Sequence, residues 1–79
     1  MKAEELKNRI YILNSEVEFY LQEMKKWSER LEFLKQFETT DALLKEMEEC
    51  NRSVMSNSYY MEQMGRQLSR CRAILYMMD

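Results

Sequence analysis

The sequence predicts an all-α fold, a long antiparallel helical hairpin with coiled-coil-like packing, and three observations carry this prediction. Apolar residues between Ala3 and Leu34 recur at spacings that alternate between three and four residues, as in a helix that packs along another helix. A second run, from Leu43 to Met78, repeats the alternation. The chain has no proline and a single glycine, so few residues interrupt a helix. Residues 1–79 are expected to form one small domain with a marginal core of its own.

A first helix is predicted from about residue 3 to about residue 37. Glu4 and Glu5 lie in its first turn, where carboxylates oppose the positive end of the helix dipole. The regularly spaced positions of this helix are Ala3, Leu6, Ile10, Leu13, Val17, Tyr20, Met24, Trp27, Leu31 and Leu34.

A turn is predicted at about residues 38–41, where the apolar pattern falters. Thr39, Thr40 and Asp41 are residue types whose side chains cap helix N-termini. Because the connection is short, the two helices should be antiparallel neighbours.

A second helix is predicted from about residue 42 to about residue 77. The polar segments 51–53 and 56–58 are poor in helix formers and indicate a possible irregularity, which would split this helix and give three helices. The unchanged phase on both sides favours one continuous helix. Its regularly spaced positions are Leu43, Met47, Cys50, Val54, Asn57, Met61, Met64, Leu68, Cys71, Leu75 and Met78.

Folding the two runs together makes one contact line, called the seam here, in which opposed residue numbers sum to about 78. Every opposed pair is apolar except Tyr20 and Asn57, which are expected to hydrogen-bond and to set the register. Beside the seam, Arg30 and Glu46 are placed to form an ion pair. Lys7 and Arg72 are expected to lie near each other as like charges.

Two flanks of the seam remain uncovered in an isolated hairpin. One carries large apolar side chains at heptad spacing, which we call the apolar stripe: Ile12, Phe19, Phe33, Phe37, Tyr60 and Ile74. The opposite flank, the small-residue flank, consists of Asn14, Leu21, Ser28, Asn51, Ser58 and Gly65. Contiguous exposed apolar surface usually marks an interface, so the stripe is the predicted partner-binding surface. It would complete a three- or four-helix bundle with itself or with a partner.

Residues that support enzyme chemistry are scarce. There is no histidine, and the carboxylates lie among lysines on helix faces, so we expect no catalysis, cofactor or metal. The two cysteines, Cys50 and Cys71, are about 30 Å apart if they share one helix, too far for a disulfide. Free thiols fit a reducing compartment, and neither a membrane span nor a signal peptide is evident. The expected location is the cytoplasm, without membrane contact.

The predicted function is therefore a non-enzymatic protein–protein interaction module, a small chaperone, adaptor or inhibitor that binds a helical partner or forms a homo-oligomer. The alternative is a nucleic-acid-binding regulator, although a net charge of −2 provides no overall field for nucleic acid. Dimers of helical hairpins of the plasmid RNA-binding Rop type have such a shape, but no motif of that family is present. The candidate basic patch would be Lys2, Lys7, Arg9, Arg66, Arg70 and Arg72.

Overall fold

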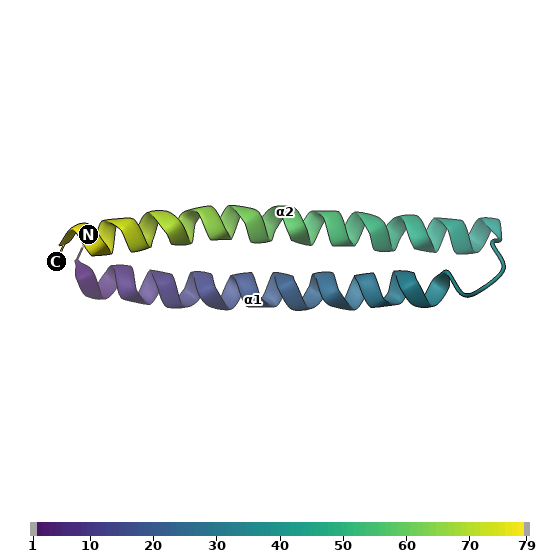
Figure 1. Cartoon of the computed structure of the whole chain (residues 1–79), viewed down its shortest axis with the longest axis horizontal. Coiled ribbons are helices and arrows are strands. Elements are labelled where there is room, and N and C mark those ends of the chain that lie inside the picture. Colours follow the sequence, from purple (N-terminus) through teal and green to yellow (C-terminus); the bar gives the residue numbers. More distant parts are fainter. Residues whose placement is uncertain (1, 79) are drawn as a thin grey trace.

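The computed structural model describes residues 2–78, so Met1 and Asp79 of the predicted domain lie outside the described residues. Two long helices run antiparallel, α1 from Ala3 to Leu34 and α2 from Asp41 to Met78, and the start of α1 lies at the same end of the rod as the end of α2 (Figure 1). The molecule measures 59 × 13 × 13 Å. Its radius of gyration is 17.7 Å, against about 12 Å for a globular domain of this length. The predicted all-α hairpin is confirmed.

Helix α1 ends at Leu34, three residues earlier than the sequence indicates. The backbone N–H groups of Gln36 and Phe37 donate to the carbonyls three residues before them, at 3.2 and 3.3 Å. These tight hydrogen bonds satisfy the last carbonyls of the helix and turn the chain out of the α-helical path. Phe37 therefore lies in the connection rather than in the helix.

Helix α2 begins as its capping residue predicts. The Oγ1 atom of Thr40 accepts a hydrogen bond from the backbone N–H of Leu43 at 3.2 Å, the contact of an N-terminal cap. The helix continues without a break through residues 51–58. Residues 51–58 therefore stay helical despite their low helix propensity, because the seam residues on both sides pack against α1.

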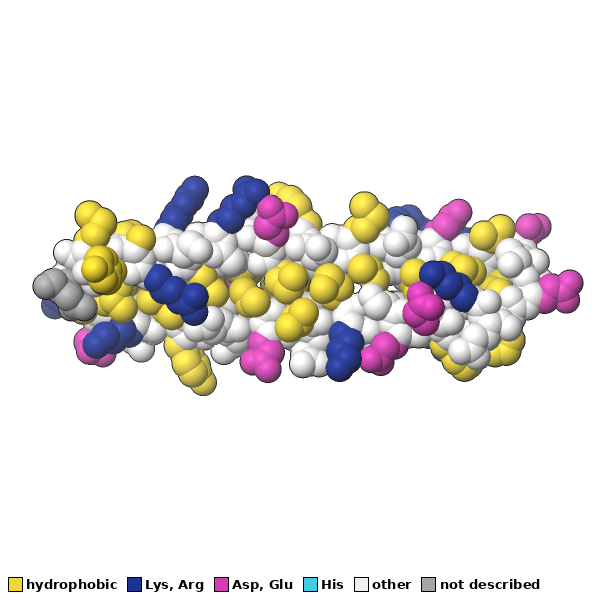
Figure 2. Space-filling model, in the orientation of Figure 1, with side chains coloured by type: hydrophobic (Ala, Val, Ile, Leu, Met, Phe, Trp, Pro, Cys, Tyr) yellow, Lys and Arg dark blue, Asp and Glu magenta, His cyan; other side chains and the backbone are white. Residues whose placement is uncertain are grey.

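The hydrophobic core occupies the seam, but its depth changes along the rod. Six seam side chains are buried, and every other seam position except the half-exposed Met78 is of intermediate exposure. On the face drawn in Figure 2, hydrophobic side chains lie in a row along the junction of the helices, so solvent still reaches the seam. Four of the buried residues form one cluster near the chain ends, against which Ile10, Val17, Met64 and Leu75 pack. The cluster is Leu6, Leu13, Leu68 and Cys71; the other two buried residues are Leu34 and Cys50.

The expected hydrogen bond between Tyr20 and Asn57 is not the contact that forms. The Nδ2 atom of Asn57 donates to the Ser53 carbonyl of its own helix at 2.8 Å. The Tyr20 ring stacks on Tyr60, with ring centroids 5.4 Å apart. A short polar side chain inside a helix finds a backbone acceptor one turn away, which leaves Tyr20 to lean out of the seam toward another ring.

Candidate protein-interaction surface

The apolar stripe is exposed along its whole length in the hairpin. Its six side chains keep about half of their surface in contact with solvent, although each is apolar or aromatic. The exposed fractions are 56% for Ile12, 59% for Phe19, 48% for Phe33, 54% for Phe37, 46% for Tyr60 and 49% for Ile74.

Four aromatic rings join the two helices at the middle of the rod. Phe19 packs edge-to-face on Tyr20 at 5.5 Å, Tyr20 stacks on Tyr60 at 5.4 Å, and Tyr60 meets Tyr59 edge-to-face at 5.7 Å. These are favourable aromatic geometries. We call this chain of rings the central aromatic cluster. The cluster leads from Phe19 of the stripe through Tyr20 and Tyr60 to Tyr59, which also lines a hollow with Met55 and Ser58.

A second group of rings lies near the turn. Phe33 and Phe37 meet edge-to-face at 5.2 Å, and the Arg30 guanidinium lies 5.7 Å from the centre of the Phe33 ring. Arg30 also binds Glu46 of α2, with Nη2 and Oε1 2.6 Å apart, which confirms the predicted ion pair. The hydrogen bond to Glu46, followed by that carboxylate's charge, raises the pKa of Arg30 above its ordinary value. Arg30 thus stays charged while its planar group covers one side of Phe33.

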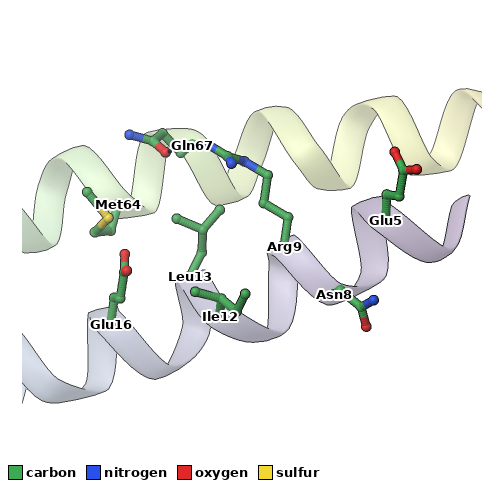
Figure 3. A pocket seen from close by; sticks show the side chains of 8 residues that line it. All are labelled: Glu5, Asn8, Arg9, Ile12, Leu13, Glu16, Met64 and Gln67. Carbon is green, nitrogen blue, oxygen red and sulfur yellow. Dashed lines mark hydrogen bonds between the residues drawn. The ribbon is translucent and has the colours of Figure 1, made fainter. Parts of the chain in front are cut away.

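The stripe residue nearest the chain ends on α1, Ile12, lines an open hollow of about 530 Å³. Leu13 of α1 and Met64 of α2 contribute its other apolar side chains, and Arg9 reaches across to Gln67 at its edge (Figure 3). The Nη2 atom of Arg9 and the Oε1 atom of Gln67 are 3.3 Å apart. Glu5, Asn8 and Glu16 of α1 also line it, so the hollow offers three apolar side chains beside polar and charged ones.

Most residues of the predicted stripe therefore contact another aromatic ring or line the hollow. One ring of the central aromatic cluster, Tyr59, was not predicted from the spacing. Tyr59 is 58% exposed and belongs to the central aromatic cluster. The signal was present, because the adjacent pair Phe19-Tyr20 lies opposite the pair Tyr59-Tyr60 when residue numbers sum to about 78. Ile74, four residues before the end of α2, lies outside both groups of rings.

The small-residue flank has no tight contact within the hairpin at its glycine. A methyl group added at Gly65 would meet nothing within 4 Å. Across this flank, Nη2 of Arg72 and Oδ1 of Asn14 are 3.3 Å apart. Packing between α1 and α2 therefore does not require a glycine at this position.

The predicted basic residues do lie at one end of the rod, but around its circumference. Arg9 contacts Gln67 beside the stripe, and Arg72 contacts Asn14 on the opposite flank. Arg66 is paired with Glu62 at 2.7 Å, and Lys7 with Glu4 at 3.8 Å. Lys7 and Arg72 thus each have a partner of their own. Arg9 and Arg70 line one hollow together with Gln67 and Cys71, whereas Arg72 lies on the opposite flank, so the six residues do not form one patch.

At the level of whole ends, the charge is nevertheless strongly divided. Residues 2–9 and 66–78, the basic end, carry six Lys or Arg against two Glu, whereas residues 29–49, the acidic end, carry three against seven Asp or Glu. Acidic side chains project from the tip of the turn in Figure 2, and basic ones gather toward the chain ends. The rod therefore has one positive and one negative end.

Other chemistry has little support in residues 2–78. Both cysteines are free thiols buried in the seam. No group of three His, Cys, Asp or Glu side chains in this range is arranged to hold a metal ion. Neither described helix is long and apolar enough to cross a membrane.

The fold and its surface define a class: a two-helix hairpin with an unpartnered apolar stripe along one flank. Comparison with protein-family models, with curated proteins and with solved structures gives no match.

Proposed function

We propose that this protein is a non-enzymatic protein–protein interaction module whose binding surface is the apolar stripe. The observation that carries the proposal is the central aromatic cluster, a run of four rings that spans both helices at the surface. Burying one large apolar side chain contributes about 1.5–3 kcal/mol. The half-exposed side chains of the stripe thus offer enough free energy for a stable complex.

The occupant of the stripe would be helical, either a partner protein or another copy of this chain. A helix laid along α1 presents side chains on one face at intervals of about seven residues, which matches the spacing from Ile12 to Phe19 and on to Phe33. Such a module would act as a small chaperone, adaptor or inhibitor. Arg30, Arg66 and Arg70 would steer an acidic partner toward it. The two buried thiols fit a reducing compartment such as the cytoplasm.

A matched pair of double variants tests the stripe. Phe19→Asp with Phe33→Asp places two charges in the stripe, and Tyr11→Asp with Tyr76→Asp places two charges elsewhere on the helices. Tyr11 and Tyr76 are more exposed, at 74% and 84%. If association depended only on how much aromatic surface is exposed, the second pair of substitutions would weaken association more than the first. We expect the stripe variant to lose association with itself and with protein partners in its native cells, and the control to keep it. Equal behaviour of the two would contradict the proposal.

Because introduced charges can also unfold a small hairpin, a second measurement leaves the fold nearly intact. Phe19, or in a control Tyr11, is replaced by the photoreactive analogue benzoylphenylalanine, and cells are irradiated. Cross-links to protein are expected from position 19 and not from position 11. Cross-linking from position 11 alone would assign the interface to another face.

The second candidate, nucleic-acid binding, is supported by the excess of basic residues at the basic end. Contacts to phosphates lose affinity steeply as salt rises. If this chain binds RNA, Arg70→Glu should weaken that binding and leave the stripe-dependent association unchanged. Electrophoretic mobility shifts at two salt concentrations would measure both effects.

A further inference from the structure

We propose that the occupant of the apolar stripe is a second copy of this chain, bound in the opposite orientation to form a four-helix bundle. This inference rests on the proposed function, since it uses the same stripe. It adds the identity of the partner, the direction of the two rods and the residues that meet. Three independent observations carry it: the area left exposed, the division of charge and the position of the hollow.

The hairpin exposes more surface than a folded monomer of its mass. Its accessible surface is 6341 Å² at 9.7 kDa, whereas a globular protein of that mass exposes about 5,100 Å². Covering the excess of about 1,200 Å² on each of two copies would bury about 2,400 Å² in total, the size of an obligate homodimer interface. Packing against a second copy would therefore cover the surface that one hairpin exposes in excess of a globular protein.

The division of charge selects the orientation. In a parallel pair, two ends of net charge +4 would lie together, as would two ends of net charge −4. In an antiparallel pair, each basic end lies beside an acidic end, and both contacts become attractive. Like charges set side by side oppose association, so the antiparallel arrangement is favoured. A two-fold axis across the middle of the rods generates it, with α1 packing on α1 of the second copy.

The hollow beside Ile12 sets the register. In an antiparallel pair of α1 helices whose residue numbers sum to about 45, Phe33 of the second copy comes level with Ile12. That hollow then receives the Phe33 ring, and the reciprocal contact forms at the other end. The two-fold axis then passes between residues 22 and 23 of α1, so that Phe19 of each copy comes level with Lys26 of the other, whose aliphatic chain packs against the ring. Near the axis on α2, Ser53 and Ser56 are small and let the two copies approach closely.

Mass and cross-linking together test the proposal on the full chain. Light scattering should give twice the 9.7 kDa of one chain. Phe33 is then replaced by benzoylphenylalanine, the purified protein is irradiated, and the cross-linked peptide is sequenced by mass spectrometry. Ile12 and Phe33 are 21 residues apart on one helix, about 30 Å. A cross-link from position 33 to residues 9–16 therefore joins two chains.

The expected result is a covalent dimer joined from position 33 to residues 9–16. Within the covalent dimer, joining to residues 41–49 would mean parallel rods and would overturn the orientation. A mass of one chain at all concentrations would overturn the second copy as occupant. In that case cross-linking from position 19 to another protein in cells would still support the proposed function, so the two failures are distinguishable.

Salt gives an independent test of the orientation. For the antiparallel pair, the dissociation constant from sedimentation equilibrium should rise about tenfold between 50 and 500 mM NaCl, because attraction between the ends is screened. A dissociation constant that falls with salt would indicate like charges in contact and would contradict the antiparallel pair. The variant Phe19→Asp with Phe33→Asp should weaken the dimer more than about 100-fold, whereas Tyr11→Asp with Tyr76→Asp should not.

Discussion

The two helices pack differently near the chain ends and at the middle of the rod, although the same heptad spacing runs through both regions. Near the ends, Leu6, Leu13, Leu68 and Cys71 are buried in one cluster. At the middle, the seam residues from Val17 to Trp27 are all of intermediate exposure. The rings there contact one another at the surface instead of filling the seam.

The difference arises from side-chain volume. Leucine and cysteine interdigitate at the end cluster, whereas at the middle the large ring of Tyr20 on α1 comes level with the short, polar Asn57 on α2. Tyr20 then finds a better contact on Tyr60 than across the seam. The α1 seam residues at the middle are therefore less completely covered than those of the end cluster.

The largest expected effect comes from truncating the end cluster. Leu13→Ala should destabilise the protein by about 2–5 kcal/mol, because Leu13 is 4% exposed and leaves a cavity. Met24→Ala, at a half-buried seam position of the middle, should cost about half as much. Urea unfolding at one protein concentration measures both. Equal losses would mean that the middle is packed as tightly as the end.

A larger apolar side chain in the seam at the middle of the rod should raise the stability of the protein. Asn57→Leu is expected to stabilise by about 1 kcal/mol, since an apolar side chain facing Tyr20 removes a partly buried amide whose hydrogen bond serves only its own helix. The thermal midpoint should rise by several degrees. A lower midpoint would show that the amide has a contact on which the register depends, as buried polar residues do in some coiled coils.

Gly65→Ala compares the two flanks. The position is helical and has space for a methyl group, so alanine should stabilise α2 by about 0.5–1 kcal/mol. Because the proposed interface is the stripe on the other flank, the dimer dissociation constant should change less than about threefold. Thermal unfolding measures the change in stability, and sedimentation equilibrium measures the dimer dissociation constant. Stabilisation with lost association would instead place an interface on the small-residue flank.

The smallest effect is expected at the half-exposed ion pair near the turn. Arg30→Gln should lower stability less than Gly65→Ala raises it, and the loss should shrink in high salt. The pKa of Arg30 is raised by Glu46, so its contribution is complete below its ordinary pKa and lost only in strongly alkaline solution. Removing Arg30 should therefore not introduce a pH dependence near neutrality through its own titration. A double-variant cycle with Glu46→Gln isolates the pair.

Most residues of the exposed apolar stripe, the candidate binding surface, were predictable because they repeat with the period of the helix. The stripe residues on α1 are 7 and 14 residues apart, and their shared flank follows from that spacing alone. Tyr59 was not predicted as part of this surface because its heptad position lies on the outer face of α2. It joins the central aromatic cluster only through its contact with Tyr60. The end of α1 was also misjudged, since no glycine marks it and hydrogen bonds of the final turn decide it.

The sequence by itself determined the two helices, the antiparallel register and the residues of the seam, because these depend on periodicity along one chain and on a cap such as Thr40. Only the tertiary structure decided how deeply each seam residue is buried and which stripe residues touch. It also decided that Tyr20 stacks on Tyr60 instead of hydrogen-bonding to Asn57. Those outcomes depend on the volumes and polar groups that two helices bring to the same level. Spacing along either helix does not contain that information.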